Sequence, residues 1–395
     1  MNYILFDDYS RNNLLPLTFL RPVADLRAGI LTIREKWELF LNCKTSSLTE
    51  DYLSNSFPTI RGENNILING SICPNQAVVD EIKKLKPNEA LLSNDSIVAL
   101  HVLSADLDKI GEGDTEGITE KEATLDFVKI NYPWDIFGKN DTNIRFDFEL
   151  LTKNRKSAPL SKTNHVINPH QIFLEEGANV EYATLNASEG PIYIGKEAII
   201  MEGAHIRGPF ALCDHAIVKM STIIYGATTV GPYAKVGGEI ENSVLLAYSN
   251  KPHYGYLGHS VIGKWCNISA GTNTANLNNT YKNVKAWNYT QEKFIDTGHM
   301  FCGLIMGDHS KTGINTMFNT GSVVGVSSNC FGSGYQRNFV SSFMWGGPAG
   351  YSGYEIKKAL ETAKEMYNRR NVEFSEEDRK ILAHIYEITI DNNRL

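Results

Sequence analysis

One stretch of the chain gathers side chains that can move a proton and bind a phosphate. It reads Asn-Lys-Pro-His-Tyr-Gly-Tyr-Leu-Gly-His over residues 250–259 and Cys-Asn-Ile-Ser-Ala-Gly-Thr-Asn-Thr-Ala-Asn-Leu over residues 266–277, and it ends in Tyr281-Lys282. Histidine is the side chain whose pKa best suits proton transfer near neutral pH. Lysine is a point charge that binds phosphate. His253 is therefore a candidate base, and Lys282 is a candidate phosphate ligand.

The sequence around this stretch repeats every six residues. Reading every sixth position gives eight consecutive aliphatic residues: Ile194, Ile200, Ile206, Leu212, Val218, Ile224, Val230 and Val236. A period of six is neither that of a helix nor that of a plain strand, so each unit must be a short strand plus a turn. Three units would close one triangular coil with the aliphatic side chains stacked inside. We therefore expect a parallel β-helix from about residue 165 to about residue 335.

Two segments break this repeat, residues 241–260 and residues 275–300. A solenoid accommodates insertions as loops that leave the coil at a corner, and function often lies in such loops. We therefore expect both segments to be loops and to be the first place to look for a site.

The flanking segments have different patterns. Residues 1–150 alternate apolar strands and helical stretches, which is typical of an α/β domain. After Gly346-Gly347-Pro348, apolar residues recur at helical spacing, and Ser375 followed by three acidic residues predicts a second helix. We predict an α/β domain over 1–150, a β-helix over 160–345 and helices that cap its end over 350–395.

Composition narrows the class of protein. The 395 residues carry a net charge of −7 without a dense Lys/Arg run, which argues against a nucleic-acid-binding protein. No stretch approaches the roughly 20 apolar residues of a membrane span. The six cysteines form no Cys-x-x-Cys pair, so we expect neither a zinc ribbon nor a disulfide framework, and no metal ligands. These features predict a globular protein of the cytoplasm.

The order His-x-x-Tyr-x-Gly, Asn-x-x-Ala-Gly-Thr, Asn and Lys over residues 253–282 resembles a known family. It is similar to the acetyltransferase half of the bifunctional N-acetylglucosamine-1-phosphate uridyltransferase/glucosamine-1-phosphate N-acetyltransferases, which are left-handed β-helix proteins with hexapeptide repeats. Within that family, the chain is most similar to a bacterial branch with an atypical N-terminal domain.

The resemblance implies an activity and a set of site residues. It implies that acetyl-CoA acetylates the amine of glucosamine 1-phosphate, with His253 and Asn276 as the catalytic residues, and that the protein is a homotrimer. The implied contacts are Tyr256 and Lys282 with the sugar phosphate, Asn267 and Asn276 with the sugar and its amine, and the Ala270 and Gly271 backbone with acetyl-CoA. The break in spacing leaves the family's basic residues on earlier coils unassigned, with Arg207, Lys219 and Lys235 as candidates.

The N-terminal domain matches the pattern of sugar nucleotidyltransferases only in part. Arg11 and Pro16-Leu17-Thr18 are kept in order, whereas the glycines are absent and Arg21-Pro22 stands where Pro-Lys is expected. Asn69-Gly70-Ser71 replaces the Gly-Asp that usually supplies a magnesium ligand. The resemblance implies uridylyl transfer from UTP to form UDP-N-acetylglucosamine, with Arg11 and Arg21 binding the nucleotide and Mg²⁺ required if the domain is catalytic.

Three other interpretations remain open at this stage. In the first, the chain is a sugar acyltransferase whose N-terminal domain binds a nucleotide without transferring it. In the second, it is a β-helix metalloenzyme of the γ-carbonic-anhydrase kind, which needs three converging histidines. In the third, it is a purely structural solenoid that binds no acetyl-CoA.

Overall fold

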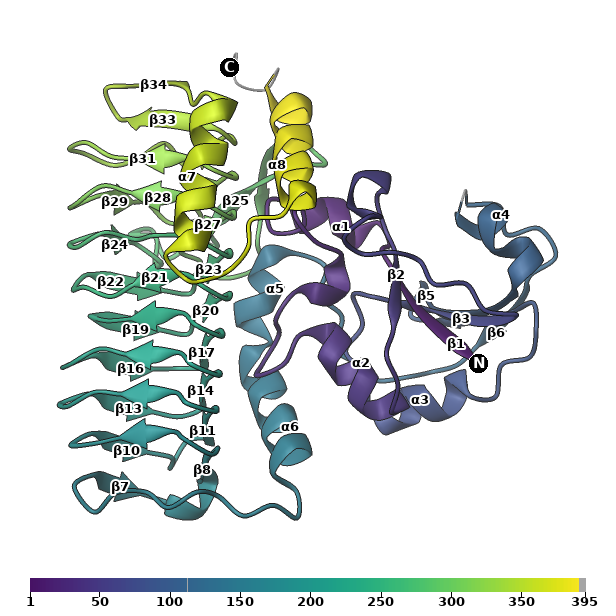
Figure 1. Cartoon of the computed structure of the whole chain (residues 1–395), viewed down its shortest axis with the longest axis horizontal. Coiled ribbons are helices and arrows are strands. Elements are labelled where there is room, and N and C mark those ends of the chain that lie inside the picture. The colour runs from purple at the N-terminus through teal and green to yellow at the C-terminus, as the bar shows by residue number, and fades with distance from the viewer. Residues whose placement is uncertain (112, 391–395) are drawn as a thin grey trace. The chain divides into compact units, whose positions relative to one another are not determined.

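The computed structural model describes residues 1–111 and 113–390 and divides the chain into two compact units (Figure 1). The first unit consists of Met1–Leu14, Leu20–Leu26 and Leu31–Tyr132. The second consists of Leu15–Phe19, Arg27–Ile30 and the chain from Pro133 onward.

The first unit is built on a six-stranded sheet in the order β2-β1-β3-β5-β4-β6. The strands are β1 (Asn2–Phe6), β2 (Ser46–Leu48), β3 (Asn64–Asn69), β4 (Glu89–Ser93), β5 (Ser96–Leu103) and β6 (Thr119–Glu122), and the helices are α1 (Ser10–Asn13), α2 (Ile33–Leu41), α3 (Gln76–Ile82) and α4 (Leu107–Gly111). Only β5 runs against its neighbours, so the other strands end at one edge of the sheet. The predicted α/β fold is confirmed.

The second unit contains the predicted β-helix, in which short parallel strands stack coil upon coil (Figure 1). Its first sheet holds β7 (His165–Ile167), β10 (Thr184–Asn186), β13 (His205–Arg207), β16 (Ile223–Tyr225), β19 (Glu239–Glu241) and β22 (Tyr256–Gly258). The second sheet holds β8 (Ile172–Leu174), β11 (Ile192–Ile194), β14 (Phe210–Leu212), β17 (Thr228–Val230), β20 (Val244–Leu245), β23 (Val261–Ile262), β27 (Ile305–Met306), β30 (Val323–Val324) and β32 (Phe339–Val340).

The third sheet begins with β9 (Asn179–Val180), β12 (Ile199–Ile200), β15 (Ile217–Val218), β18 (Lys235–Val236) and β21 (Asn250–Lys251). Later coils continue it with β28 (Lys311–Thr312), β31 (Asn329–Cys330), β33 (Met344–Gly347) and β34 (Gly350–Gly353), whereas β24 (Asn273–Thr274) and β29 (Met317–Phe318) pair with each other in a separate sheet. Pairing within these sheets is parallel, except that β33 and β34 form an antiparallel hairpin.

The inward positions of the prism are those that the repeat predicts. All eight aliphatic residues from Ile194 to Val236 are at most 2% exposed and belong to one core. Each coil pairs its backbone with the next, so the aliphatic stack and the hydrogen-bond ladder share one register. The predicted left-handed β-helix is confirmed.

Residues 241–260 are not a loop, and the expectation for this segment was wrong. They form β19 to β22 and continue the coils, with Ile240, Leu245 and Leu257 in the core. The period was hidden because the corners change length here and because Lys251 takes an inward position opposite Val236. A charged residue in an aliphatic series conceals the repeat.

The second break behaves as expected. Residues 275–300 leave the coil and carry an antiparallel hairpin of β25 (Lys285–Asn288) and β26 (Lys293–Asp296). Trp287 stacks on Phe339 with ring centroids 4.4 Å apart, which attaches the hairpin to a later coil.

Four helices complete the second unit: α5 (Pro133–Gly138), α6 (Asn140–Thr152), α7 (Ile356–Asn368) and α8 (Glu376–Thr389). The predicted C-terminal helices are confirmed, and Ser375 caps α8 by accepting a hydrogen bond from the Asp378 amide. The expectation that they cap the end of the prism was wrong for α7, which packs along the side of the coils, where Tyr367 stacks on Trp265. None of the helices within the described residues is both long and apolar enough to cross a membrane.

Candidate functional site

A pocket of about 660 Å³ lies on the third sheet of the β-helix and is lined by five basic side chains. We call it the basic pocket. Its lining residues are Lys219, Lys235, Tyr248, Asn250, Pro252, His253, Trp265, Asn267, Lys311, Met366, Arg369 and Arg370. It therefore contains the candidate base and one of the candidate sugar ligands, His253 and Asn267.

The floor of the basic pocket is a row of four polar residues on successive coils. Lys235 pairs with Asn250, Asn250 with Asn267, and Asn267 with Lys311. Neighbouring strands are about 4.8 Å apart, so the row spans roughly 14 Å. The parallel register thus places a lysine at each end and two amides between them.

The C-terminal end of α7 forms one wall of the basic pocket. Arg370 donates a hydrogen bond from Nη2 to Oδ1 of Asn250 at 2.8 Å. Beside it, Tyr367 stacks on Trp265 at 4.1 Å between ring centroids, and Trp265 stacks on Tyr248 at 4.2 Å. This aromatic stack holds the helix end, and with it Arg369 and Arg370, against the coils.

The electrostatics of the basic pocket favour an anionic ligand. Burial, together with the nearby Arg370, Lys219 and Arg369, lowers the pKa of Lys235. Burial lowers the pKa of Lys311 to about 8. No carboxylate is among the described residues that line the pocket. The basic side chains of the pocket repel one another. A phosphate ligand would bind to them and would also reduce this repulsion.

His253 lies at the corner where the third sheet turns into the first, between β21 and β22, and its side chain is exposed. The turn lies against Gly238 of the preceding coil, where a Cβ atom would be 2.8 Å from the His253 carbonyl oxygen. Gly238 also has a φ of +79°, which favours glycine. The glycine therefore lets the His253 turn approach closely.

Lys251 supports the same turn from inside the prism. Its side chain is 1% exposed, and its Nζ donates to the carbonyl oxygens of His253 at 2.9 Å and Gly237 at 3.0 Å. Burial lowers the pKa of Lys251 to about 8. A buried ammonium group is costly unless it is hydrogen-bonded, so these two carbonyls are what keeps the side chain in the core.

Ala270 and Gly271 lie at the same corner, one coil further on. The Gly271 amide donates to the Tyr254 carbonyl at 3.0 Å, and the Ala270 carbonyl accepts from the Asn315 amide at 2.9 Å. These backbone groups take part in the ladder between coils. Their contact with acetyl-CoA remains a prediction.

Tyr256 and Asn276 belong to a separate hydrogen-bonded group on the first sheet, which we call the Tyr256 network. It consists of Glu241, Tyr256, His259 and Asn276. The Tyr256 hydroxyl donates to Glu241, and Asn276 Nδ2 donates to the Tyr256 oxygen at 2.7 Å. The pKa of Tyr256 is raised by burial and by the bond to Glu241.

Lys282 is exposed in the loop after β24, outside the residues that line the basic pocket.

Of the three basic residues that the sequence left as candidates, Lys219 and Lys235 line the basic pocket, whereas Arg207 pairs with Glu189 at 2.9 Å. Sequence reasoning missed three other basic residues of this pocket, which are Lys311, Arg369 and Arg370. Lys311 could have been found by following the outward positions of the repeat. Arg369 and Arg370 were hidden because no spacing rule links a helix more than a hundred residues away to a coil.

In the first unit, Arg11 is buried in a polar cluster after β1. Its Nη1 lies 2.9 Å from Asp7 Oδ2, and its Nη2 donates to the Tyr52 hydroxyl at 3.0 Å. Arg21 is also buried, and its carbonyl accepts from Arg11 at 3.0 Å. The structural pairing with Asp7 is therefore present. A role for Arg11 and Arg21 in nucleotide binding remains a prediction.

A second carboxylate at this edge of the sheet is also paired. Asp8 Oδ2 lies 2.8 Å from Lys129 Nζ and accepts from Asn69 Nδ2 at 2.9 Å. Despite its burial, the pKa of Asp8 is lowered by hydrogen bonds from Lys129, Ser10 and Asn69. This arrangement holds the carboxylate in its ionised form.

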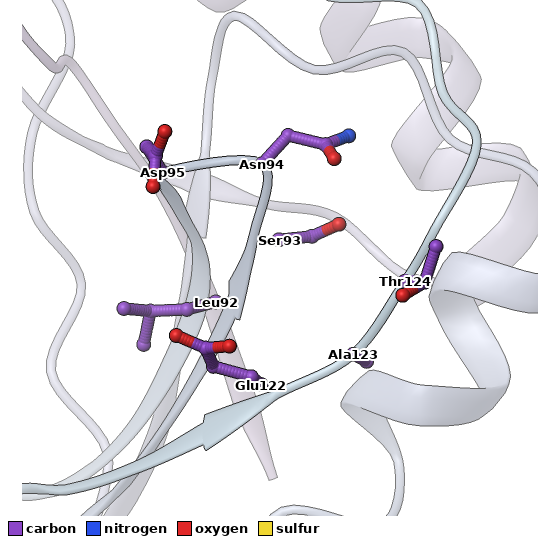
Figure 2. Close-up of a pocket in the computed structure, with 7 residues that line it drawn as sticks. All are labelled: Leu92, Ser93, Asn94, Asp95, Glu122, Ala123 and Thr124. Atoms are coloured by element: carbon purple, nitrogen blue, oxygen red, sulfur yellow. The ribbon is translucent and has the colours of Figure 1, made fainter.

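The same sheet edge carries a smaller pocket of about 340 Å³ (Figure 2). Its lining residues are Leu92, Ser93, Asn94, Asp95, Glu122, Ala123 and Thr124. Figure 2 shows Asp95 in the turn between β4 and β5 and Glu122 at the end of β6. Two carboxylates without a basic residue among these seven make the pocket unsuitable for a triphosphate.

A metalloenzyme would need three converging ligands. Among the residues that the structure describes, no three His, Cys, Asp or Glu side chains are placed to hold a metal ion.

Comparisons with known proteins confirm the resemblance seen in the sequence. Residues 3–156 match the family model described as sugar nucleotidyl transferase. The chain is 30% identical over 211 residues to the bifunctional protein GlmU of Methanocaldococcus jannaschii, a match that covers 53% of this chain and 46% of that protein. It is 32% identical over 140 residues to the bifunctional sugar-1-phosphate nucleotidylyltransferase/acetyltransferase of Sulfurisphaera tokodaii, covering 35% of this chain and 34% of that protein.

The chain thus spans less than half the length of these two relatives. Among solved structures, the UDP-N-acetylglucosamine acyltransferase from Campylobacter jejuni aligns with 58% of this chain and 97% of that chain. The identity is 14% and the TM-score is 0.28. A likeness at this level is no argument about function.

The buried Lys251 predicts a pH-dependent stability. Its folded pKa lies below its unfolded value, so between about pH 8 and about pH 10.5 the unfolded chain binds more protons and stability rises with pH. Over this window, the free energy of unfolding of the wild type should rise relative to Lys251→Met by up to about 3 kcal/mol. Urea titrations at several pH values measure this, with the exposed Lys285→Met as control. An equal pH dependence of wild type and Lys251→Met would contradict the assignment.

Proposed function

We propose that the β-helix transfers an acetyl group from acetyl-CoA to the amine of glucosamine 1-phosphate. The observation that carries this proposal is that His253 and five basic side chains line one pocket. A base beside a phosphate site is what acetylation of an amino-sugar phosphate requires. The matches to bifunctional relatives named for nucleotidylyl and acetyl transfer support it.

In the proposed reaction, the sugar phosphate binds to the basic pocket with its amine near His253. The amine attacks the thioester carbonyl, so a C–N bond forms and the C–S bond to CoA breaks. His253 accepts the proton that the amine loses, and the thiolate of CoA leaves and is protonated. Asn267 orients the sugar, and the backbone of Ala270 and Gly271 contacts acetyl-CoA. Asn276, Tyr256 and Lys282 lie outside the basic pocket, and they would contact the sugar phosphate from a neighbouring subunit.

The number of cations in the basic pocket exceeds what one phosphate monoester needs. A monoester carries about two negative charges near pH 7, against five basic side chains. We therefore propose that the phosphates of CoA bind in the same pocket, next to the sugar phosphate. The alternatives of a metalloenzyme and of a structural solenoid lack a use for such a pocket.

Replacing the proposed base tests the function directly. His253→Ala should lower the rate of CoA release by 10²- to 10⁴-fold, because the amine loses its proton acceptor. Thermal stability should change little, since the side chain is exposed. His170→Ala, at an exposed histidine between β7 and β8, is the matched control and should keep full activity. Near-normal CoA release by His253→Ala would refute the assignment.

We also propose that the active protein is a homotrimer in the cytoplasm. The corner that carries His253 also carries large exposed apolar side chains on every second coil: Tyr182, Met220, Ile223 and Tyr254 are between 45% and 67% exposed. A neighbouring subunit packed on this corner would cover them and would close the basic pocket. The basic pocket and the Tyr256 network lie on different sheets, so a shared site would also bring both to one substrate.

The trimer predicts linked assembly and activity. Light scattering should give about three times the chain mass of 44.1 kDa. Ile223→Glu should dissociate the subunits and abolish CoA release, because a charge would be buried in the interface. Ile60→Glu, at an exposed position of the first unit, should do neither. A monomer with full activity would overturn the shared site.

For the N-terminal unit, we propose uridylyl transfer from UTP to give UDP-N-acetylglucosamine. The match of residues 3–156 to the sugar nucleotidyl transferase model supports it, as does the retained Pro16-Leu17-Thr18. The residues do not fit a magnesium ion, because Asp7 faces Arg11, Asp8 faces Lys129, and Asn69 stands where an aspartate is expected. The alternative is that the unit only binds a sugar nucleotide.

Pyrophosphate release separates these two possibilities. With UTP and N-acetylglucosamine 1-phosphate, we expect the full chain to release pyrophosphate. Arg11→Ala and Arg21→Ala should lower that release on the order of 10²-fold by removing charge from the nucleotide site. Both variants should keep acetyl transfer, which depends on the second unit. If the intact protein releases no pyrophosphate with any nucleotide, the binding-only alternative holds.

A further inference from the structure

The Tyr256 network has one hydrogen-bond arrangement that satisfies all its members. The Tyr256 hydroxyl donates to the Glu241 carboxylate. Asn276 Nδ2 donates one hydrogen to the Tyr256 oxygen at 2.7 Å and the other to His259 Nδ1 at 2.9 Å. An amide nitrogen can only donate, so His259 Nδ1 must be the acceptor and the ring proton must be on Nε2. The arrangement therefore requires a neutral His259.

The surroundings of His259 favour that neutral form. Its side chain is 14% exposed, and its ring stacks on Phe301 and meets Phe137 edge-on. Burial lowers the pKa of His259, and His299 acts in the same direction. Glu241, whose Oε2 lies 4.0 Å from Nδ1, acts in the opposite direction. Glu241, Tyr256 and His299 are the titratable groups that face His259 in the described structure.

We propose that His259 is a positioning residue that fixes the side-chain amide of Asn276 for orienting the sugar. The proposal rests on the proposed acetyl transfer and on the roles of Asn276 and Tyr256 in it. Without an acceptor at Nδ1, the amide of Asn276 is free to turn and can present its oxygen where its nitrogen now lies. Asn276 would then lose its donor contact to Tyr256.

The proposal predicts a pH effect on substrate binding. Protonation of His259 places a hydrogen on Nδ1, which removes the acceptor for Asn276. The new cation attracts Glu241, the acceptor of the Tyr256 hydroxyl. Both changes weaken the hydrogen bonds that join His259, Asn276, Tyr256 and Glu241. The KM of the wild type for glucosamine 1-phosphate should therefore rise more steeply toward acid pH than the KM of a variant whose residue 259 keeps the acceptor but cannot be protonated.

Two substitutions distinguish positioning from a merely structural role. In His259→Asn, the side-chain oxygen branches at the position of Nδ1, so an acceptor remains and it cannot be protonated. In His259→Phe, the ring remains and the acceptor is lost. At pH 7.5 we expect His259→Asn to keep KM within about threefold of the wild type, and toward acid pH we expect its KM to rise less steeply than that of the wild type. We expect His259→Phe to raise KM roughly tenfold, as the loss of one hydrogen bond would, with kcat nearly unchanged.

The closing experiment combines kinetics with NMR of the full chain. CoA release is measured against glucosamine 1-phosphate from pH 5.5 to 8.5, with thermal unfolding as the check on folding. The protein is labelled with ¹⁵N-histidine, and the signal of His259 is identified as the one that is absent from the His259→Asn variant. At pH 7.5 this signal should show an unprotonated Nδ1. If the wild type acetylates no sugar phosphate, the proposed function fails, whereas the NMR signal still tests the network. An Asn variant no better than the Phe variant, or a protonated Nδ1 at pH 7.5, would overturn the proposal.

Discussion

The narrow interior of the prism is the constraint on which the rest of this structure depends. Each coil encloses only a few side chains, and they are aliphatic because parallel strands pair on every face and leave no room for water. Residues from Ile194 to Val236 fill these positions at six-residue spacing. Chemistry is therefore confined to outward positions and corners. The parallel register then repeats one outward position from coil to coil, which is how Lys235, Asn250, Asn267 and Lys311 form a row.

Lys251 is an exception to the aliphatic interior of the prism, and its side chain connects the core to the His253 turn. An inward lysine weakens the core, and Lys251 has no acidic partner among the residues that the structure describes. Its ammonium group is satisfied by the carbonyls of Gly237 and His253. The backbone of the His253 turn is thereby attached to the interior of the prism. A base carried by an exposed corner gains a defined position in this way, since its own side chain packs against little.

The sequence predicted the parts of the molecule that follow local rules. The repeat identified the inward residues, and helical spacing with Ser375 identified the C-terminal helices. Prediction from the sequence failed where the spacing of the inward residues is irregular. Short corners and the inward Lys251 concealed β19 to β22 within residues 241–260. It also failed where contacts are long-range. Arg370 reaches Asn250 from a helix that no pattern connects to that coil, and the bond from Asn276 to His259 depends on the packing of two coils.

The central claim is that the basic pocket holds the phosphate of the acceptor beside His253. The most direct measurement is the initial rate of CoA release from acetyl-CoA with glucosamine 1-phosphate, compared with glucosamine, at low and at high salt. The account predicts turnover with the phosphorylated sugar at least about a hundredfold above that with glucosamine, since two or more charge-assisted contacts are lost, and a KM that rises with salt. Equal rates with both sugars and no effect of salt would contradict it.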